Sequence, residues 1–214
     1  MSAASNAVPA ASPVVRFAEA EMPTQAGTFR LVVYRMRGQD PSLPPDAVKE
    51  HLAIVSGDPA DGGGLDVLAR VHSECWTGET LGSLKCDCRE QLDQALEAIG
   101  KAGRGVIVYL RQEGRGIGLG NKIRAYALQN EGADTVEANE RLGFAPDLRS
   151  YELAAAILKD LGVASVALMT NSPDKLDGLR AAGVEAVRVP HWTGVQAFNQ
   201  GYLEVKRQKL GHLE

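Results

Sequence analysis

The three cysteines of this chain, Cys75, Cys86 and Cys88, fall in one short window with the spacing Cys-x10-Cys-x-Cys. Three thiolates can hold a zinc ion and leave its fourth position open for water, which is the arrangement of a hydrolytic metal site. An odd, clustered set of cysteines fits poorly with a disulfide framework. The cysteines therefore predict a metal site, against the simpler interpretation that they are ordinary buried apolar residues.

Spacing alone leaves the kind of metal site open. Cys86 and Cys88 flank a single residue, which is tighter than the Cys-x2-4-Cys knuckle of a structural zinc module. His72, three residues before Cys75, could instead be a fourth ligand and close a structural Cys3His site. Glu74 is either a base beside an open metal or an exposed carboxylate at the end of a strand.

A glycine-rich segment, 112–124, lies between an expected buried strand and an expected helix. Backbone N–H groups and the helix dipole favour phosphate at such a place, and Arg115, Lys122 and Arg124 could complete a polyphosphate clamp. The segment is not a Walker A loop, because Ile123 follows Lys122, and it does not fit G-x-G-x-x-G. It indicates either a phosphate site or a tight turn.

Two further polar segments stand at the expected N-termini of helices. Asp147 and Arg149 belong to the first, and Lys175 follows Asn171 and Ser172 in the second. Helix capping is a sufficient explanation of each segment by itself. Together with a metal and the glycine-rich segment, they indicate hydrolysis of a phosphorylated small molecule such as a nucleotide.

The hydrophobic pattern predicts an α/β (α+β) fold with a mixed sheet, antiparallel N-terminal strands and flanking helices. We expect strands at 28–34, 52–56, 67–72, 106–110, 163–170 and 184–189, and helices at 91–99, 122–130, 151–161 and 173–183. Asp147 or Ser150 is expected to cap the third of these helices, and residues 202–213 to form a charged helix or tail. Residues 1–13 are expected to be a disordered tail, and 14–214 a single catalytic domain.

The composition excludes several classes of protein. With 44% hydrophobic and 23% charged residues in 214, the chain has the make-up of a soluble globular protein. Its net charge of −4 gives no electrostatic case for nucleic acid or a membrane surface, and no run approaches the roughly 18 apolar residues of a membrane span. The N-terminus lacks the pattern of a secretion signal, so we expect a cytoplasmic protein with reduced thiols.

With these residues laid out, the chain resembles GTP cyclohydrolase II, the enzyme that opens riboflavin synthesis. The resemblance covers 15–190 and 202–213, and six blocks carry it in order: 70–75 (RVHSEC), 83–88 (SLKCDC), 111–115 (RQEGR), 121–126 (NKIRAY), 134–139 (DTVEAN) and 209–213 (KLGHL). The chain departs from the family at Arg89, where the family usually has glycine, and at Trp76 and Glu79. The segment 191–200 fits the family least well.

The resemblance implies a set of site residues. Cys75, Cys86 and Cys88 would bind one catalytic Zn²⁺ per subunit, so that His72 is not a ligand. Asp147 would be the proton acceptor, Arg149 the nucleophile toward the α-phosphate, and Tyr126 the tyrosine that completes ring opening. GTP would be bound by Arg70, Val71, His72, Ser73, Glu74, Gln91, Glu113, Gly114, Arg115, Thr135, Thr170 and Lys175.

The implied reaction converts GTP and water into 2,5-diamino-6-ribosylamino-4(3H)-pyrimidinone 5′-phosphate, formate and pyrophosphate, with Mg²⁺ on the triphosphate and a homodimer as the assembly. A guanidinium is effectively always protonated, so covalent attack by Arg149 and charge stabilisation by it both stay open. Asp147 can assist only from outside a helix, because helical positions two apart do not face each other.

Three alternatives also remain open. One is a cyclohydrolase on the same scaffold that serves a secondary pathway, and another stops at the formamidopyrimidine. The third is a non-catalytic GTP sensor with a structural Cys3His zinc, which would bind GTP without turnover.

Overall fold

The computed structural model describes residues 12–40, 42–44, 47–145 and 147–193, together with 204, 211 and 213. The expected N-terminal tail therefore lies outside the described residues as far as residue 11, and so does nearly all of the expected charged segment 202–213. Among the described residues, none of the helices combines the length and apolar character that crossing a bilayer requires.

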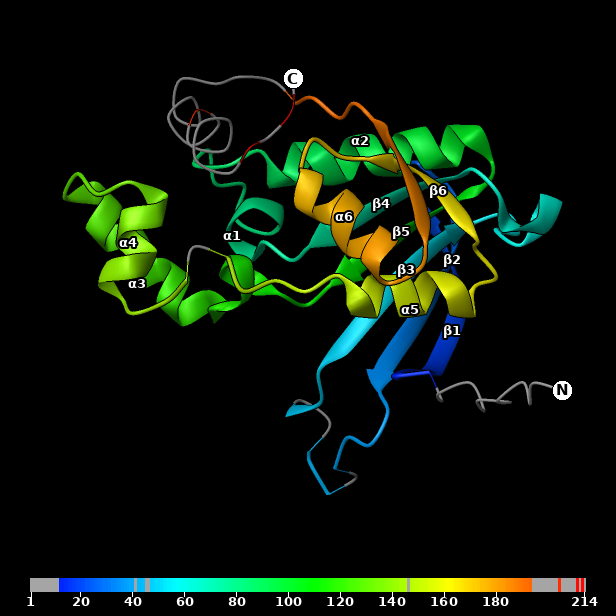
Figure 1. Ribbon diagram of the computed structural model, residues 1–214, viewed down its shortest axis with the longest axis horizontal. Coiled ribbons are helices and arrows are strands. Elements are labelled where there is room, and N and C mark those ends of the chain that lie inside the picture. The colour runs from blue at the N-terminus through cyan, green and yellow to red at the C-terminus, as the bar shows by residue number, and fades with distance from the viewer. Residues whose placement is uncertain are drawn as a thin grey trace, which may run out of the picture.

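One mixed sheet of seven strands, in the order β1-β2-β3-β5-β4-β6-β7, organises the chain (Figure 1). Its antiparallel part consists of β1 (Val14–Thr24), β2 (Gly27–Met36) and β3 (Glu50–Ser56), and β3 pairs antiparallel with β5 (Gly105–Leu110). Its parallel part consists of β5, β4 (Val67–Ser73), β6 (Ser165–Met169) and β7 (Glu185–Val189). The predicted mixed sheet with antiparallel N-terminal strands is confirmed.

Helices cover both faces of this sheet (Figure 1). Helix α2 (Cys88–Ala102) packs on one face, and α5 (Glu152–Asp160) and α6 (Pro173–Ala181) pack on the other. Successive side chains of β5 point to opposite faces of the sheet. Ile107 therefore packs in the core under α2, whereas Val106 and Val108 pack in the core under α5 and α6. A strand buried on both faces explains why residues 106–110 are apolar without alternation.

Three further helices lie together beyond one end of the sheet (Figure 1). They are α1 (Trp76–Glu79), α3 (Gly118–Asn130) and α4 (Thr135–Arg141). The pattern did not predict α4, and α3 begins four residues before the predicted position 122. Asp134 begins α4 with a capping box, since its carboxylate accepts from the N–H groups of Val136 and Glu137.

One interpretation from the sequence requires correction and one element was missed. Asp147 does not cap the helix after residue 150, because Tyr151 takes the N-cap position of α5 and Asp147 binds Arg149, whereas the hydroxyl of Ser150 accepts the N–H of Glu152, the first residue of α5 (3.4 Å). Strand β1 was not predicted, since it is an edge strand whose side chains are mostly exposed beyond Val14 and therefore carry little hydrophobic pattern.

The parallel strands end at the same edge of the sheet, and this places the site. The N–H group of Glu74, just after β4, donates to the carbonyl of Leu110 at the end of β5 (2.9 Å). The N–H group of Thr170, just after β6, donates to the carbonyl of Val189 at the end of β7 (3.0 Å). The segments that follow all four strands therefore meet at one edge, where ligands bind in open parallel sheets.

We expect Gly64→Ala to lower the free energy of unfolding by about 3 kcal/mol, because a left-handed conformation and a backbone clash add together. Gly64 has φ +68°, and a Cβ there would lie 2.0 Å from the carbonyl oxygen of Gly162. Its neighbour Gly63 has φ +74° but open space around it, so Gly63→Ala is the matched control and should cost only about 1 kcal/mol. Urea unfolding measures both losses, and equal losses would contradict the expectation.

His51 should account for about 2 to 3 kcal/mol of the stability that the folded chain loses as the pH drops from 6.5 to 4. Burial lowers the pKa of this imidazole to about 4, and its Nδ1 accepts the N–H of Arg111 (3.2 Å). Between those pH values the unfolded chain binds the proton and the folded chain does not, so acid favours unfolding. His51→Asn keeps an acceptor for Arg111 but cannot titrate. Urea unfolding across this pH range should give a shallower slope for His51→Asn than for the parent chain, and an unchanged slope would exclude this role for His51.

Candidate active site

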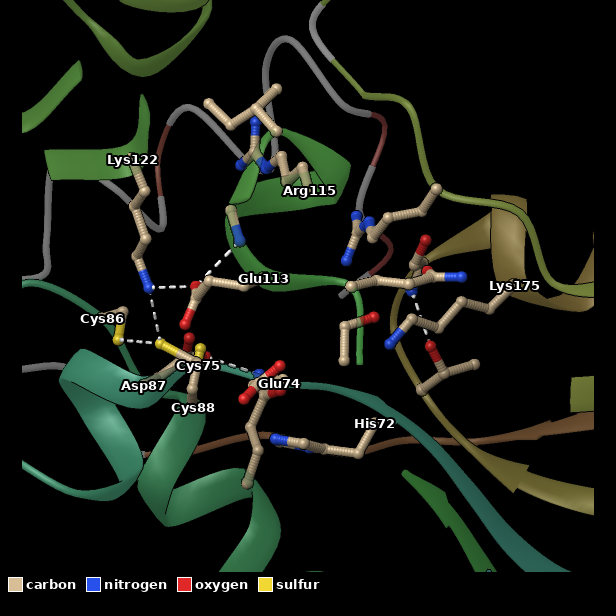
Figure 2. Close-up of a pocket in the computed structure, with 18 of the residues that line it drawn as sticks. His72, Glu74, Cys75, Cys86, Asp87, Cys88, Glu113, Arg115, Lys122 and Lys175 are labelled. Atoms are coloured by element: carbon tan, nitrogen blue, oxygen red, sulfur yellow. Dashed lines mark hydrogen bonds and ion pairs between the residues drawn. The ribbon is translucent and has the colours of Figure 1, made fainter. Parts of the chain in front are cut away.

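A cavity opens at the edge where the parallel strands end (Figure 2). Its free space, counted out to open solvent, is about 1290 Å³. Each parallel strand contributes the residues that follow it. These are Glu74 and Cys75 after β4, Gln112 to Arg115 after β5, Thr170 to Ser172 after β6, and His191 and Trp192 after β7.

The three cysteines lie together in the wall of this cavity. Cys75 precedes α1, and Cys88 begins α2. Their sulfur atoms, with that of Cys86, all lie within 4.8 Å of one another, and the Sγ atoms of Cys75 and Cys86 are 3.6 Å apart. Tetrahedral zinc with bonds of about 2.3 Å would place two sulfurs about 3.8 Å apart, so the group fits zinc.

The neighbourhood of the sulfur atoms is consistent with a metal site. A Cβ on Gly78 would lie 3.0 Å from the Sγ of Cys86 and 3.3 Å from that of Cys75, so glycine leaves the space that the group needs. Hydrogen bonds from the other two thiols lower the pKa of Cys75, and nearby Lys122 lowers it further. The hydrogen bond to Cys75 raises the pKa of Cys86 to about 11. The lowered pKa favours a thiolate at Cys75, and a bound metal would deprotonate all three thiols.

His72 binds a carboxylate instead of joining the sulfur group. Its Nε2 lies 2.9 Å from Oε1 of Glu79, and burial lowers the pKa of the imidazole. The same Oε1 accepts the N–H of Cys75 (2.8 Å), and Oε2 accepts the hydroxyl of Tyr109 (2.6 Å). The rings of His72 and Tyr109 stack with their centroids 5.7 Å apart. Glu79 thus links the loop of the first cysteine to β4 and β5.

Arg89, which stands where the family usually has glycine, is accommodated outside the sulfur group. Its Nη1 donates to the carbonyl oxygen of Glu79 (2.6 Å), and its Nε pairs with Asp93 one helical turn later (3.0 Å). The residue therefore connects the end of α1 to the start of α2.

The glycine-rich segment makes a tight turn as well as part of the cavity wall. Arg115 has φ +58° between Gly114 and Gly116, a conformation that costs a side-chain-bearing residue about 1 kcal/mol. Arg115 lines the cavity, whereas Arg124 binds Asn121 on α3. Arg124 is therefore not among the residues that line the cavity.

Glu113, the first residue of this turn, is nearly buried and uses both carboxylate oxygens. Oε1 accepts the N–H of Gly114 (2.8 Å) and the ammonium of Lys122 (2.7 Å), and Oε2 accepts the N–H of Trp76 (2.7 Å). Lys122 also lies 3.1 Å from the Sγ of Cys75. Lys122 therefore faces the sulfur group, in contrast to the phosphate contact expected from the sequence.

A chain of buried polar contacts crosses the floor of the cavity. Arg70 donates to the carbonyl of Met169 (2.7 Å) and to Oε1 of Gln91, and burial lowers its pKa to about 10. The amide of Gln91 donates in turn to Asp87 (2.7 Å), which also accepts the hydroxyl of Thr193 (3.0 Å). Asp87 sits between two cysteines in the sequence, so this chain connects the sulfur group with the floor of the cavity.

The side of the cavity after β6 and β7 is built by a lysine, an asparagine and a histidine. Lys175 donates to the carbonyl oxygen of Val71 (2.8 Å), so the main chain of Val71 contacts a residue of the cavity wall. Asn171 holds His191 through the N–H and the carbonyl of that residue (3.1 and 2.9 Å), and Nε2 of His191 lies 3.0 Å from the carbonyl of Gln91. The sequence interpretation missed His191 and Trp192, although their position just after the last strand is a signal for such a site.

Arg149 lines the main cavity and a second cavity beside it, whereas Asp147 lines only the second. Asp147 lies outside any helix and is held by Nε of Arg149 at 2.9 and 3.0 Å, so the condition that it lie outside a helix is met. Burial acts to raise the pKa of Asp147, but the hydrogen bond and charge of Arg149 outweigh it and keep the pKa below its ordinary value. The carboxylate therefore stays charged and pairs with the guanidinium.

The remaining predicted residues lie in or near the same wall. Tyr126 of α3 lines the cavity, and burial raises the pKa of its hydroxyl to about 12. Ser73 lines the cavity at the end of β4, and Thr170 accepts the N–H of Ser172 (3.1 Å). Thr135 begins α4, but its side chain lies outside what the structure describes.

Comparison with known proteins gives consistent matches. The family model for GTP cyclohydrolase II matches residues 15–190. A GTP cyclohydrolase-2 from Actinobacillus succinogenes is 50% identical over 200 residues, covering 93% of this chain and 88% of that protein. Another from Hahella chejuensis is 50% identical over 201 residues, covering 94% and 92%. The riboflavin biosynthesis protein RibBA of Synechocystis is 52% identical over 193 residues, covering 90% of this chain and 33% of that protein.

We expect Glu79→Ala to lower the free energy of unfolding by about 3 kcal/mol, because it leaves three donors without their acceptor at about 1 kcal/mol each. The donors belong to His72, Cys75 and Tyr109. Glu97→Ala, on the exposed face of α2, makes the same substitution and should change stability by less than about 0.5 kcal/mol. Thermal and urea unfolding report the difference. A loss at Glu79 no larger than at Glu97 would show that these contacts do not stabilise the fold.

Proposed function

This chain belongs to the GTP cyclohydrolase II family, and we propose that it hydrolyses GTP, opening the imidazole ring at C8. The products are formate, pyrophosphate and 2,5-diamino-6-ribosylamino-4(3H)-pyrimidinone 5′-phosphate, and the reaction is the first step of riboflavin biosynthesis. The observation that carries the proposal is the group of three cysteines in a cavity whose wall also holds cationic side chains.

Cys75, Cys86 and Cys88 hold one zinc ion in each subunit. The distances among their sulfur atoms support this choice, and three cysteine ligands would leave zinc able to accept water or substrate. Zinc bound there supplies the activation of water for hydrolysis near neutral pH. The group of candidate ligand atoms contains the three sulfurs and no nitrogen of His72, which supports an open site over the closed Cys3His alternative.

The cavity wall binds the nucleotide. The residues assigned to GTP are Arg70, His72, Ser73, Glu74, Gln91, Glu113, Gly114, Arg115, Thr170 and Lys175, together with Val71 through its carbonyl and Thr135 from α4. Arg115, Arg149 and Lys175 supply positive charge for the triphosphate, and Mg²⁺ bound with the triphosphate would neutralise part of its charge. Glu113 acts indirectly, since its two oxygens already hold Trp76, Gly114 and Lys122.

Arg149 stabilises the charge on the α-phosphate. Its ion pair with Asp147 keeps the guanidinium protonated and oriented, which supports electrostatic stabilisation over covalent attack. Asp147 remains the assigned proton acceptor, and its lowered pKa supports a second role in positioning Arg149. Tyr126 completes the ring opening, with its raised pKa keeping the hydroxyl protonated and able to donate.

The enzyme works as a homodimer in the cytoplasm, without nucleic acid or membrane partners. The assembly is taken from the resemblance to the family. The net charge of −4 supports the exclusion of polyanionic partners.

Purified protein incubated with GTP, Zn²⁺ and Mg²⁺ should release formate and pyrophosphate together with the pyrimidine product. Cys86→Ser should reduce formate release by at least about 10²-fold, since a metal that activates water contributes several kcal/mol. Ser83→Ala, in the same loop, is the control and should retain activity. Formate by enzymatic assay, pyrophosphate by coupled assay and pyrimidine absorbance are followed in parallel.

The other outcomes separate the alternatives. Pyrophosphate without formate would identify an enzyme that stops at the formamidopyrimidine. GTP binding without either product would identify a sensor and overturn the proposed reaction.

A further inference from the structure

Lys122 occupies an unusual position for a cation in a site for a polyphosphate. It lies on α3, its side chain is nearly buried, and its ammonium points at the sulfur group (Figure 2). Nζ is 3.1 Å from the Sγ of Cys75 and 2.7 Å from Oε1 of Glu113. Two of the three donors of the ammonium are therefore directed at a metal-ligating sulfur and at a carboxylate.

These contacts form a closed ring that returns to the cysteine from which it starts. The N–H of Trp76, the next residue after Cys75, donates to Oε2 of Glu113 (2.7 Å). Oε1 of the same carboxylate accepts from Lys122, which donates to the Sγ of Cys75. The backbone of residues 75 and 76 closes the ring. One buried ion pair thus fixes the side chain of Cys75 and the main chain of the residue that follows it.

The negative charge of the sulfur group explains why a cation is needed beside it. Three thiolates around a divalent ion leave one net negative charge, which is costly to bury without a nearby cation. An N–H···S contact from an ammonium is charge-assisted and also restricts the orientation of the sulfur. Partners of this kind that contact ligands of a metal change its affinity by 10–100-fold when they are removed.

We infer that Lys122 is a positioning residue of the metal site, which holds Cys75 in its ligating orientation and offsets the charge of the three thiolates. The inference rests on the proposed function only in taking the cysteines as metal ligands. It replaces a role for Lys122 on the phosphates with a role on the metal. Glu113 shares this role, because it anchors Lys122.

The chain offers a matched control in Lys85. This residue neighbours a cysteine in the sequence, and its Nζ lies 5.1 Å from the ring centroid of Tyr126, against 5.7 Å for Lys122. Its ammonium is exposed and binds Oδ1 of Asn130 (2.7 Å) instead of a sulfur. Replacing either lysine by methionine removes one positive charge at a similar distance from the aromatic ring of Tyr126.

The test measures zinc affinity of the full chain, without GTP, by competition with a chromophoric chelator. Lys122→Met should bind Zn²⁺ about 10–100-fold more weakly, while Lys85→Met should stay within about threefold of the parent. Lys122→Arg restores a charged donor and should recover part of the affinity. In Co²⁺-loaded protein, Lys122→Met should also shift the sulfur-to-cobalt charge-transfer bands, which a purely structural role would leave unchanged.

A double-mutant cycle tests the ring itself. Glu113→Gln should weaken zinc binding in the same direction, and the double variant with Lys122→Met should lose little more than the single variants, since both break one ring. Additive losses would overturn the shared role. Circular dichroism tests whether each variant is folded. If Lys122→Met does not fold, Lys122→Gln provides a second neutral variant.

Two results would overturn the inference. Unchanged zinc affinity of Lys122→Met with a raised KM for GTP would assign Lys122 to the phosphates. Equal losses in Lys122→Met and Lys85→Met would show a general effect of charge. A chain that binds zinc with the expected dependence on Lys122, yet does not turn over GTP, would overturn the proposed function and leave this inference standing.

Discussion

The parallel pairing of β4 with β5 on one side and β6 on the other determines where this molecule can do chemistry. It brings the ends of the parallel strands to one edge, so that segments far apart in the sequence meet there. The register of the strand pairing determines the site as much as the parallel direction of the strands does. A slip of one residue in β4 would move Arg70 and His72 to the opposite face of the sheet. The antiparallel strands complete the sheet by covering the other side of β5.

Buried carboxylates hold the loops at that edge in a single conformation. The N–H groups of Cys75 and Trp76, at the start of α1, are accepted by Glu79 and Glu113 respectively. A buried carboxylate or N–H group without a partner costs free energy, so the loop that carries the first cysteine has few alternatives to its observed conformation. The position of that cysteine is thus decided by acids from α1 and from the turn after β5.

The charge of the cavity is local and differs from the charge of the chain. The whole sequence carries −4, yet Arg70, Arg115, Lys122, Arg149 and Lys175 all line the cavity. Most of these cations are already oriented by a carbonyl or a carboxylate, as with Lys175 on Val71 and Arg149 on Asp147. Cations held in place before a substrate arrives need little reorganisation to stabilise developing negative charge.

The sequence by itself determined the class of the fold, the core strands and the cysteine group, because hydrophobic periodicity reports local burial and residue types report their chemistry. It could not reveal β1, whose exposed side chains carry little pattern, or the contacts of His191, whose neighbours come from α2 and the end of β6. It also assigned Lys122 to phosphate, because a lysine beside glycines suits that role. Only the tertiary structure decided that this ammonium meets a sulfur 47 residues away, since that contact depends on how α3 packs against the segment after β4.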